Sequence, residues 1–156
     1  YDILNQNPEW VFVPYGTGHL YENIVNIAQR EASSFVFHDK RFKGDHRKIG
    51  KCHFVGATTN NPSSIADKLY SPHLPFVHLD PHWINLAKRK GHIGAKSRVG
   101  IVREEYLQEA MKIAEMNNLV CEPSGIAGLA MLLQMKEEVP QEEKKLIINT
   151  GKVRYE

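Results

Sequence analysis

Three short stretches of the 156-residue chain combine glycine with groups that can bind a ligand. They read PYGTGHL at 14–20, EPSGIAG at 122–128 and NTGK at 149–152. The first offers consecutive backbone amides, the second a carboxylate and the third a hydroxyl. Backbone amides at the start of a helix are a common phosphate site. The chemistry to expect is therefore the binding of a phosphate-bearing small molecule.

The first stretch has the features of a phosphate-binding turn. Gly16 and Gly18 permit positive φ angles and a close approach of the backbone to an anion. The amides that can point at one anion belong to Thr17, Gly18, His19 and Leu20. A glycine-rich turn between a strand and a helix also occurs without any ligand, so this stretch alone does not establish a site.

A dinucleotide-binding turn is a competing interpretation of the same glycines. Asp39 stands about twenty residues further on, where such folds place the acid that binds the ribose. The third glycine of that motif, however, would fall at Tyr21. A phenol at this position opposes the close packing of helix on strand that glycine allows.

The other two stretches follow apolar runs directly. Glu122 comes after the run 119–121, and Ser124 is placed to cap the helix that we expect to follow. Thr150 comes just after the run 146–148. Taken singly, the second stretch is a capped helix packed on a sheet, and the third stretch is a turn. Together with the first stretch they predict one composite site.

The elements that must position these residues are predicted by apolar periodicity. Continuous apolar runs are typical of buried parallel strands, and they occur at 10–13, 35–37, 99–102, 119–121 and 146–148. Apolar residues at helical spacing predict helices after Gly18, from Glu104 to the Asn117–Asn118 pair, and from about Ile126. A short helix is expected over 64–70, and the rest of 39–96 is irregular.

This alternation of strands and helices predicts the fold. We expect a single α/β domain over 1–156, with three α/β/α layers and a mostly parallel, Rossmann-like sheet. Ligands of such sheets bind beyond the carboxyl ends of the strands. The three stretches should therefore meet at one edge of the sheet.

Composition narrows the class of partner. Twenty basic and eighteen acidic residues leave a net charge of +2, which gives no reason to expect a nucleic-acid or membrane partner. Two cysteines without metal-type spacing predict inert thiols in a reducing, cytoplasmic setting. No run approaches the roughly 18 apolar residues of a membrane helix.

The three stretches, in this order, resemble the later half of the pyridoxal-phosphate enzymes of the tryptophan-synthase-β type. That family includes cysteine synthase, threonine synthase and the serine/threonine dehydratases. SIADKL at 64–69 is similar to a TIADGL-like stretch found at the same place in many members. The resemblance runs from about residue 8 to residue 151, and its specificity lies in the three stretches.

The resemblance implies a role for each site residue. A loop like that formed by Gly16, Thr17, Gly18, His19 and Leu20 binds the phosphate of pyridoxal 5'-phosphate in the family. A hydroxyl like that of Thr150 meets the pyridine nitrogen, and an acid like Glu122 lies near the ring. A neutral partner leaves the pyridine unprotonated, which suits β- or γ-elimination and replacement on a small amino-acid substrate. A homo-oligomer, a dimer, is expected.

One departure from the family changes the functional expectation. The family carries its cofactor on a Schiff-base lysine upstream of the phosphate loop, but none of the thirteen residues before Pro14 is lysine. Lys40, Lys51 and Lys96 stand in polar contexts typical of surface charges. His19 replaces a small residue, and KVRYE after Thr150–Gly151 lacks a further glycine.

We therefore expect no catalytic residue in this chain, which would be one half of an enzyme and inactive alone. Its partner would be the missing N-terminal half. The start of the chain at Tyr1, about ten residues before the first strand, is also expected of a piece of a longer protein. A non-catalytic phosphate-binding or interaction module is the alternative outside the enzyme class.

Two further clusters are weaker candidates. His73, His78 and His82, with Asp80, could collect a metal, but their irregular spacing favours structural or surface roles, so no metal site is expected. The run DKRFKGDHRKIGK at 39–51 could meet an anionic partner. Its interspersed acids favour a solvated loop.

Overall fold

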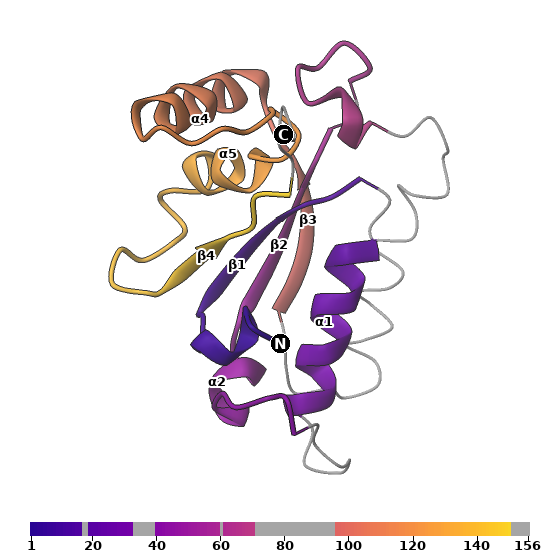
Figure 1. The fold of residues 1–156 in the computed structure, drawn as a ribbon, viewed down its shortest axis with the longest axis vertical. Helices are drawn as coiled ribbons and strands as arrows, with labels where there is room; N and C mark the ends of the chain where they lie inside the picture. The colour runs from indigo at the N-terminus through magenta and orange to yellow at the C-terminus, as the bar shows by residue number, and fades with distance from the viewer. Residues whose placement is uncertain (17–18, 33–39, 60, 71–95, 151–156) are drawn as a thin grey trace.

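The computed structural model describes residues 1–16, 19–32, 40–59, 61–70 and 96–150. Within these residues four strands form one parallel sheet in the order β3-β2-β1-β4 (Figure 1). The strands are β1 (Trp10–Pro14), β2 (His53–Thr58), β3 (Lys96–Ile101) and β4 (Lys145–Ile147).

Strand β1 is central to this sheet. It pairs with β2 from Trp10↔His53 to Pro14↔Ala57, and with β4 from Trp10↔Lys145 to Phe12↔Ile147. All five residues of β1 are buried. An uninterrupted apolar strand of this kind is what a parallel sheet covered on both faces requires.

Helices cover both faces of the sheet. Helices α1 (His19–Ala32) and α2 (His46–Gly50) pack on the face to which Val11 and Val13 contribute. Helices α4 (Glu104–Met116) and α5 (Ala127–Gln134) pack on the face to which Trp10 and Phe12 contribute (Figure 1). The predicted fold class, three α/β/α layers around a parallel Rossmann-like sheet, is confirmed.

Two short 3-10 helices complete the described elements: η1 (Leu4–Gln6) before β1, and η2 (Asp67–Leu69) after β2. The helix expected over 64–70 is thus present only as this single turn. The predictions of β1, β3, β4, α1, α4 and α5 are confirmed to within a few residues. The run 35–37 lies outside the described residues.

The strand expected at 119–121 is wrong. Helix α4 ends with Asn118 in the left-handed region, at φ 57°, and the Leu119 amide donates to the Ala114 carbonyl (2.9 Å). This bond and the one from Asn118 to Glu115 (3.1 Å) close the helix end in a Schellman motif. The Leu119 amide is therefore engaged with the helix, and Leu119 and Val120 are 54% and 66% exposed.

The expected capping role of Ser124 is also wrong. Helix α5 begins at Ala127, its N-cap residue is Ile126, and no side chain caps it. Ser124 instead is buried in the turn before the helix. The amide of Ile126 donates to the Glu122 carbonyl (3.1 Å), so a backbone turn precedes the helix where a side-chain cap was expected.

Strand β2 was not anticipated. Its sequence, HFVGAT, has a glycine in the middle of its apolar run. A Cβ on Gly56 would lie 3.1 Å from Val99 Cγ2 and 3.2 Å from Tyr15 Cδ2, so the glycine fits a crowded point of the sheet.

None of the helices in the described part of the chain has the length and apolar character to cross a bilayer.

Gly128 in helix α5 generates a stability prediction. A Cβ there would lie 2.8 Å from the Phe12 carbonyl oxygen, which already accepts the Ile148 amide (2.9 Å). Although alanine favours helix by about 1 kcal/mol, the clash with fixed sheet backbone should dominate. We expect Gly128→Ala to lower the free energy of unfolding by about 1–3 kcal/mol in urea titration.

Gly16→Ala is the matched control for this substitution. A Cβ on Gly16 would make only ordinary contacts, at 3.5 Å from the Lys68 carbonyl oxygen and 3.9 Å from Leu69. Its free energy of unfolding should stay within about 1 kcal/mol of the parent. Equal losses for the two variants would contradict the close packing of α5 on β1.

Candidate functional site

The three glycine-containing stretches meet at the carboxyl edge of the sheet, and η2 lies between the first two. A Cβ on Gly16, just after β1, would be 3.5 Å from the Lys68 carbonyl oxygen. The Leu69 carbonyl accepts a hydrogen bond from Thr58 Oγ1 (3.5 Å) at the end of β2. η2 thus lies beside the carboxyl end of β1 and is bonded to the end of β2.

An ion pair joins η2 to the second stretch. The Lys68 ammonium binds a carboxylate oxygen of Glu122, just before helix α5. The Lys68 side chain is 65% exposed and that of Glu122 is 22% exposed. A cation and an anion therefore stand side by side at this edge, both accessible to water.

The third stretch reaches the same edge through backbone hydrogen bonds. Beyond β4, the Ile148 amide donates to Phe12 in β1 (2.9 Å), and the Thr150 amide donates to the Gly125 carbonyl (3.3 Å). Thr150 thus lies beside the turn that carries Glu122. The expectation that Gly16, Glu122 and Thr150 share one end of the sheet agrees with the placement of these described residues.

The phosphate loop itself is described only at its two ends. The backbone of Gly16 lies outside the left-handed region, so this glycine does not supply the positive φ that its residue type permits. Thr17 and Gly18 lie outside the described residues. His19 and Leu20 are exposed in the first turn of α1. Whether the four amides converge on one anion stays a prediction.

Tyr21 bears on the dinucleotide alternative. Its side chain is buried, and its hydroxyl lies within hydrogen-bond distance of the Phe54 carbonyl (3.1 Å) and the Arg98 carbonyl (3.2 Å). A phenol so placed fills the space between α1 and the sheet where a dinucleotide fold needs its third glycine. Asp39, the acid of that alternative, lies outside the described residues.

Lys68 is the residue at this edge that sequence reasoning missed. The stretch SIADKL was noted, but for its likeness to other proteins and not for its lysine. No local signal in the sequence points to this lysine, because Gly16 and Glu122 each stand more than fifty positions away from it along the chain. Glu104, an acid in the first turn of α4, also bonds outside its helix, because its Oε2 accepts the Ile65 amide (3.2 Å). That bond ties the segment before η2 to helix α4.

Neither metal nor thiol chemistry is supported by the described residues. Among them no group of three His, Cys, Asp or Glu side chains could hold a metal ion. His73, His78, Asp80 and His82 lie outside the described residues. Burial raises the pKa of the Cys52 thiol, and the Glu9 carboxylate raises it further. Burial likewise raises the pKa of Cys121.

No family model matches the chain, and a search of curated proteins finds no match. The residues at the carboxyl edge, and the resemblance of their sequence stretches, are therefore the features that indicate a function.

The burial of both cysteines predicts slow thiol chemistry. The thiolate is the reactive form. A raised pKa lowers the fraction of thiolate at neutral pH, and burial keeps the sulfur away from a reagent in solution. With Ellman's reagent at neutral pH, we expect Cys52 and Cys121 to react at least about 100-fold more slowly in the native chain than after unfolding. Rapid labelling of either cysteine in the folded chain would contradict the buried placement and reopen a nucleophilic role.

Proposed function

We propose that this chain is the cofactor-phosphate-binding half of a pyridoxal-phosphate-dependent lyase or synthase that acts on a small amino acid. The observation that supports this most is the meeting of the three stretches at one sheet edge. Gly16 lies beside η2, Lys68 of η2 pairs with Glu122, and the Thr150 amide bonds to Gly125. Their order in the chain is that of the family they resemble.

The described residues fit the cofactor in charge and in donor type. The loop from Gly16 to Leu20 would hold the phosphate, and Lys68, whose backbone lies beside Gly16, brings a positive charge to the same edge. Thr150 would offer its hydroxyl to the pyridine nitrogen, and Glu122 would lie near the ring. When bound, the cofactor supplies an electron sink for the substrate, with the pyridine left neutral.

The catalytic lysine is proposed to come from a facing half of the enzyme. Lysine chemistry of this kind uses a desolvated, neutral amine. Lys68 does not have this character, because its side chain is mostly exposed and is paired with Glu122. The facing half would also close the site against water. A homodimeric assembly and a cytoplasmic location complete the proposal.

Phosphate dependence of ligand binding tests the first part of the proposal. We expect pyridoxal phosphate to bind the chain more tightly than pyridoxal, because only the phosphate can use the backbone amides of a helix start. Backbone amide resonances of residues 16–20 should shift on titration. Equal affinity for the two compounds, with no change in this loop, would contradict the proposal.

NAD should bind no better than an unrelated nucleotide, and Asp39→Ala should leave the affinity for NAD unchanged.

Complementation tests the second part of the proposal. The chain alone should show no turnover of serine, threonine or their O-activated derivatives with added pyridoxal phosphate, since it lacks the lysine and the wall of the site. Supplying a facing half, as a separate chain or a preceding segment, should create activity. In that complex Thr150→Ala should reduce kcat, because the pyridine nitrogen loses its partner.

Borohydride reduction followed by peptide mapping locates the lysine. The stable adduct should form on a lysine of the facing half and not on the 156-residue chain. A stoichiometric adduct at one lysine of this chain, together with turnover, would show that the chain is a complete enzyme. Phosphate binding without activity in any complemented complex would favour a non-catalytic phosphate-binding module.

A further inference from the structure

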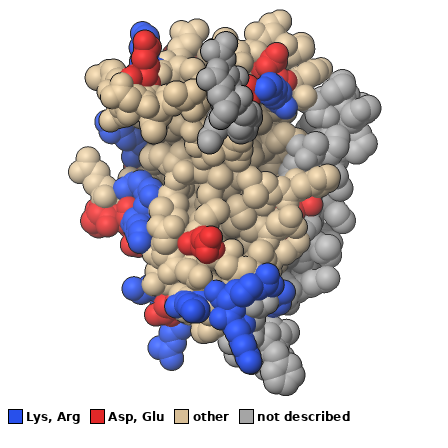
Figure 2. All heavy atoms as spheres, in the orientation of Figure 1, with Lys and Arg blue, Asp and Glu red and all other residues tan. Residues whose placement is uncertain are grey.

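The loop before α2, together with α2 itself, presents a basic surface at the amino end of the sheet. Figure 2 shows Lys and Arg side chains gathered at the lower end of the molecule, where Figure 1 places α2. The exposed basic residues of this segment are Lys40, Arg41, Lys43, Arg47, Lys48 and Lys51. We propose that this basic surface binds the phosphate backbone of a nucleic-acid duplex.

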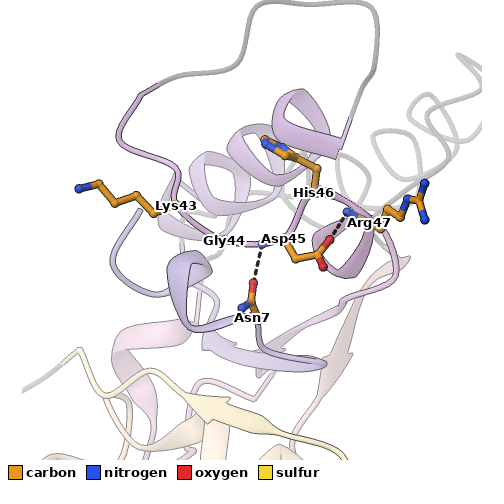
Figure 3. Close-up of a pocket in the computed structure, with 6 residues that line it drawn as sticks. All are labelled: Asn7, Lys43, Gly44, Asp45, His46 and Arg47. Atoms are coloured by element: carbon orange, nitrogen blue, oxygen red, sulfur yellow. Dashed lines mark hydrogen bonds between the residues drawn. The ribbon is translucent and has the colours of Figure 1, made fainter.

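The backbone beneath these side chains is held by two asparagines next to β1. Asn5 accepts the Lys43 amide (2.7 Å) and donates to the Arg41 carbonyl (3.0 Å). Asn7 accepts the Asp45 amide (2.7 Å; Figure 3). The segment is therefore a fixed platform for its cations.

Two apolar side chains anchor the same segment from below. Phe42 and Ile49 are buried in the core that α1 and α2 form with the sheet. His46 reaches inward as well, with its Nδ1 2.7 Å from the Glu31 carbonyl oxygen. Apolar anchors pointing in and cations pointing out give the segment two distinct faces.

The acid within the segment is engaged with the start of α2. Asp45 accepts hydrogen bonds from the backbone amides of Arg47 (2.8 Å) and Lys48 (3.3 Å). These two bonds, in this order, hold the pKa of Asp45 below its ordinary value. Its charge is thus balanced locally by amides at the helix start.

An open hollow marks the middle of the surface (Figure 3). Its lining residues are Asn7, Lys43, Gly44, Asp45, His46 and Arg47. The side chains of Lys43 and Arg47 extend in opposite directions from the Gly44–Asp45 turn (Figure 3). Lys43 and Arg47 thus present a cation on either side of the hollow.

The character of the surface favours nucleic acid over the other polyanions. In residues 40–51, all of which the structure describes, no large apolar side chain is exposed. Membrane-surface segments insert apolar side chains, and protein interfaces centre on aromatic or apolar anchors. Nucleic-acid interfaces are more polar and more positively charged. The same absence of exposed aromatics in 40–51 leaves no platform for stacking single-stranded bases, which favours a duplex.

The overall charge concealed this surface in the sequence. The net charge of +2 sums the basic segment and an acidic segment elsewhere in the sequence, because nine of the eighteen acidic residues lie in 104–143. Association with a phosphate backbone depends on the local field and on the number of phosphates neutralised. A small total charge therefore does not exclude it.

The basic surface is separate from the proposed cofactor site. Segment 40–51 immediately precedes β2, whereas Gly16, Lys68 and Glu122 lie at the carboxyl ends of the strands. The six residues of β2 put these ends about 20 Å apart. The proposal does not depend on pyridoxal phosphate, and the two sites can be tested separately.

Anisotropy of a labelled duplex tests the proposal on the whole chain. RNA and DNA duplexes of one sequence, about 16 base pairs long, are titrated at salt concentrations between about 50 and 200 mM. We expect an association constant whose logarithm falls linearly with the logarithm of the salt concentration. Neutralising two cations, Lys43→Gln with Arg47→Gln, should reduce the slope by about 2 and weaken binding at least about ten-fold near 100 mM salt.

A charge-matched variant separates this surface from total charge. Lys112→Gln with Lys136→Gln removes two positive charges from exposed positions, one in α4 and one just after α5, and this variant should bind the duplexes like the parent chain. Equal losses in the two double variants, or no binding at the lowest salt, would overturn the proposal. Tighter binding to polyglutamate, or to phosphatidylserine-containing vesicles, than to either duplex would overturn it in favour of an acidic protein or a membrane.

Discussion

The burial of β1 on both faces is the constraint on which the rest of the structure depends. All five of its residues pair with β2 and the first three also pair with β4, and the side chains of residues 10–13 alternate between the α4–α5 core and the α1–α2 core. Phe12 contributes to this arrangement twice, because its carbonyl accepts the Ile148 amide and contacts Gly128 of α5. The strand thus positions both helix layers, and the turn after it is the one that carries Gly16.

The elements that sequence reasoning predicted correctly are those whose signal is local. Apolar runs and helical spacing suffice for β1, α1, α4 and α5, and the Asn117–Asn118 pair marks the end of α4 by its tolerance of a left-handed residue. The run 119–121 is as apolar as a strand but its first amide is bonded to the helix that precedes it. Strand β2 was hidden because Gly56 interrupts its apolar run, and only the neighbouring side chains of Tyr15 and Val99 explain that glycine.

The candidate site, too, could be predicted only in part from the sequence. Its place at the carboxyl edge could be predicted, because parallel strands bring their carboxyl ends together whatever their separation in sequence. Lys68 could not, since its importance comes from contacts with Gly16 and Glu122 that are made across the fold. Segment 40–51 shows a third case: its charged side chains are exposed to solvent, as expected, but the bonds from Asn5 and Asn7 that fix its backbone are made across the fold and leave no local signal in the sequence.

The pairing of β1 with β4 also has a consequence for how the chain folds. Trp10 lies beside His53 on one side and beside Lys145, 135 positions further along the chain, on the other. Closing the longer loop costs about 1 kcal/mol more conformational entropy than closing the shorter one. During synthesis from the amino terminus, β1 therefore meets β2 well before β4 emerges, and the edge of β1 that pairs with β4 waits until then. Among the described strands β4 is synthesised last, and it brings Thr150 to the edge, so the candidate site is incomplete until β4 pairs with β1.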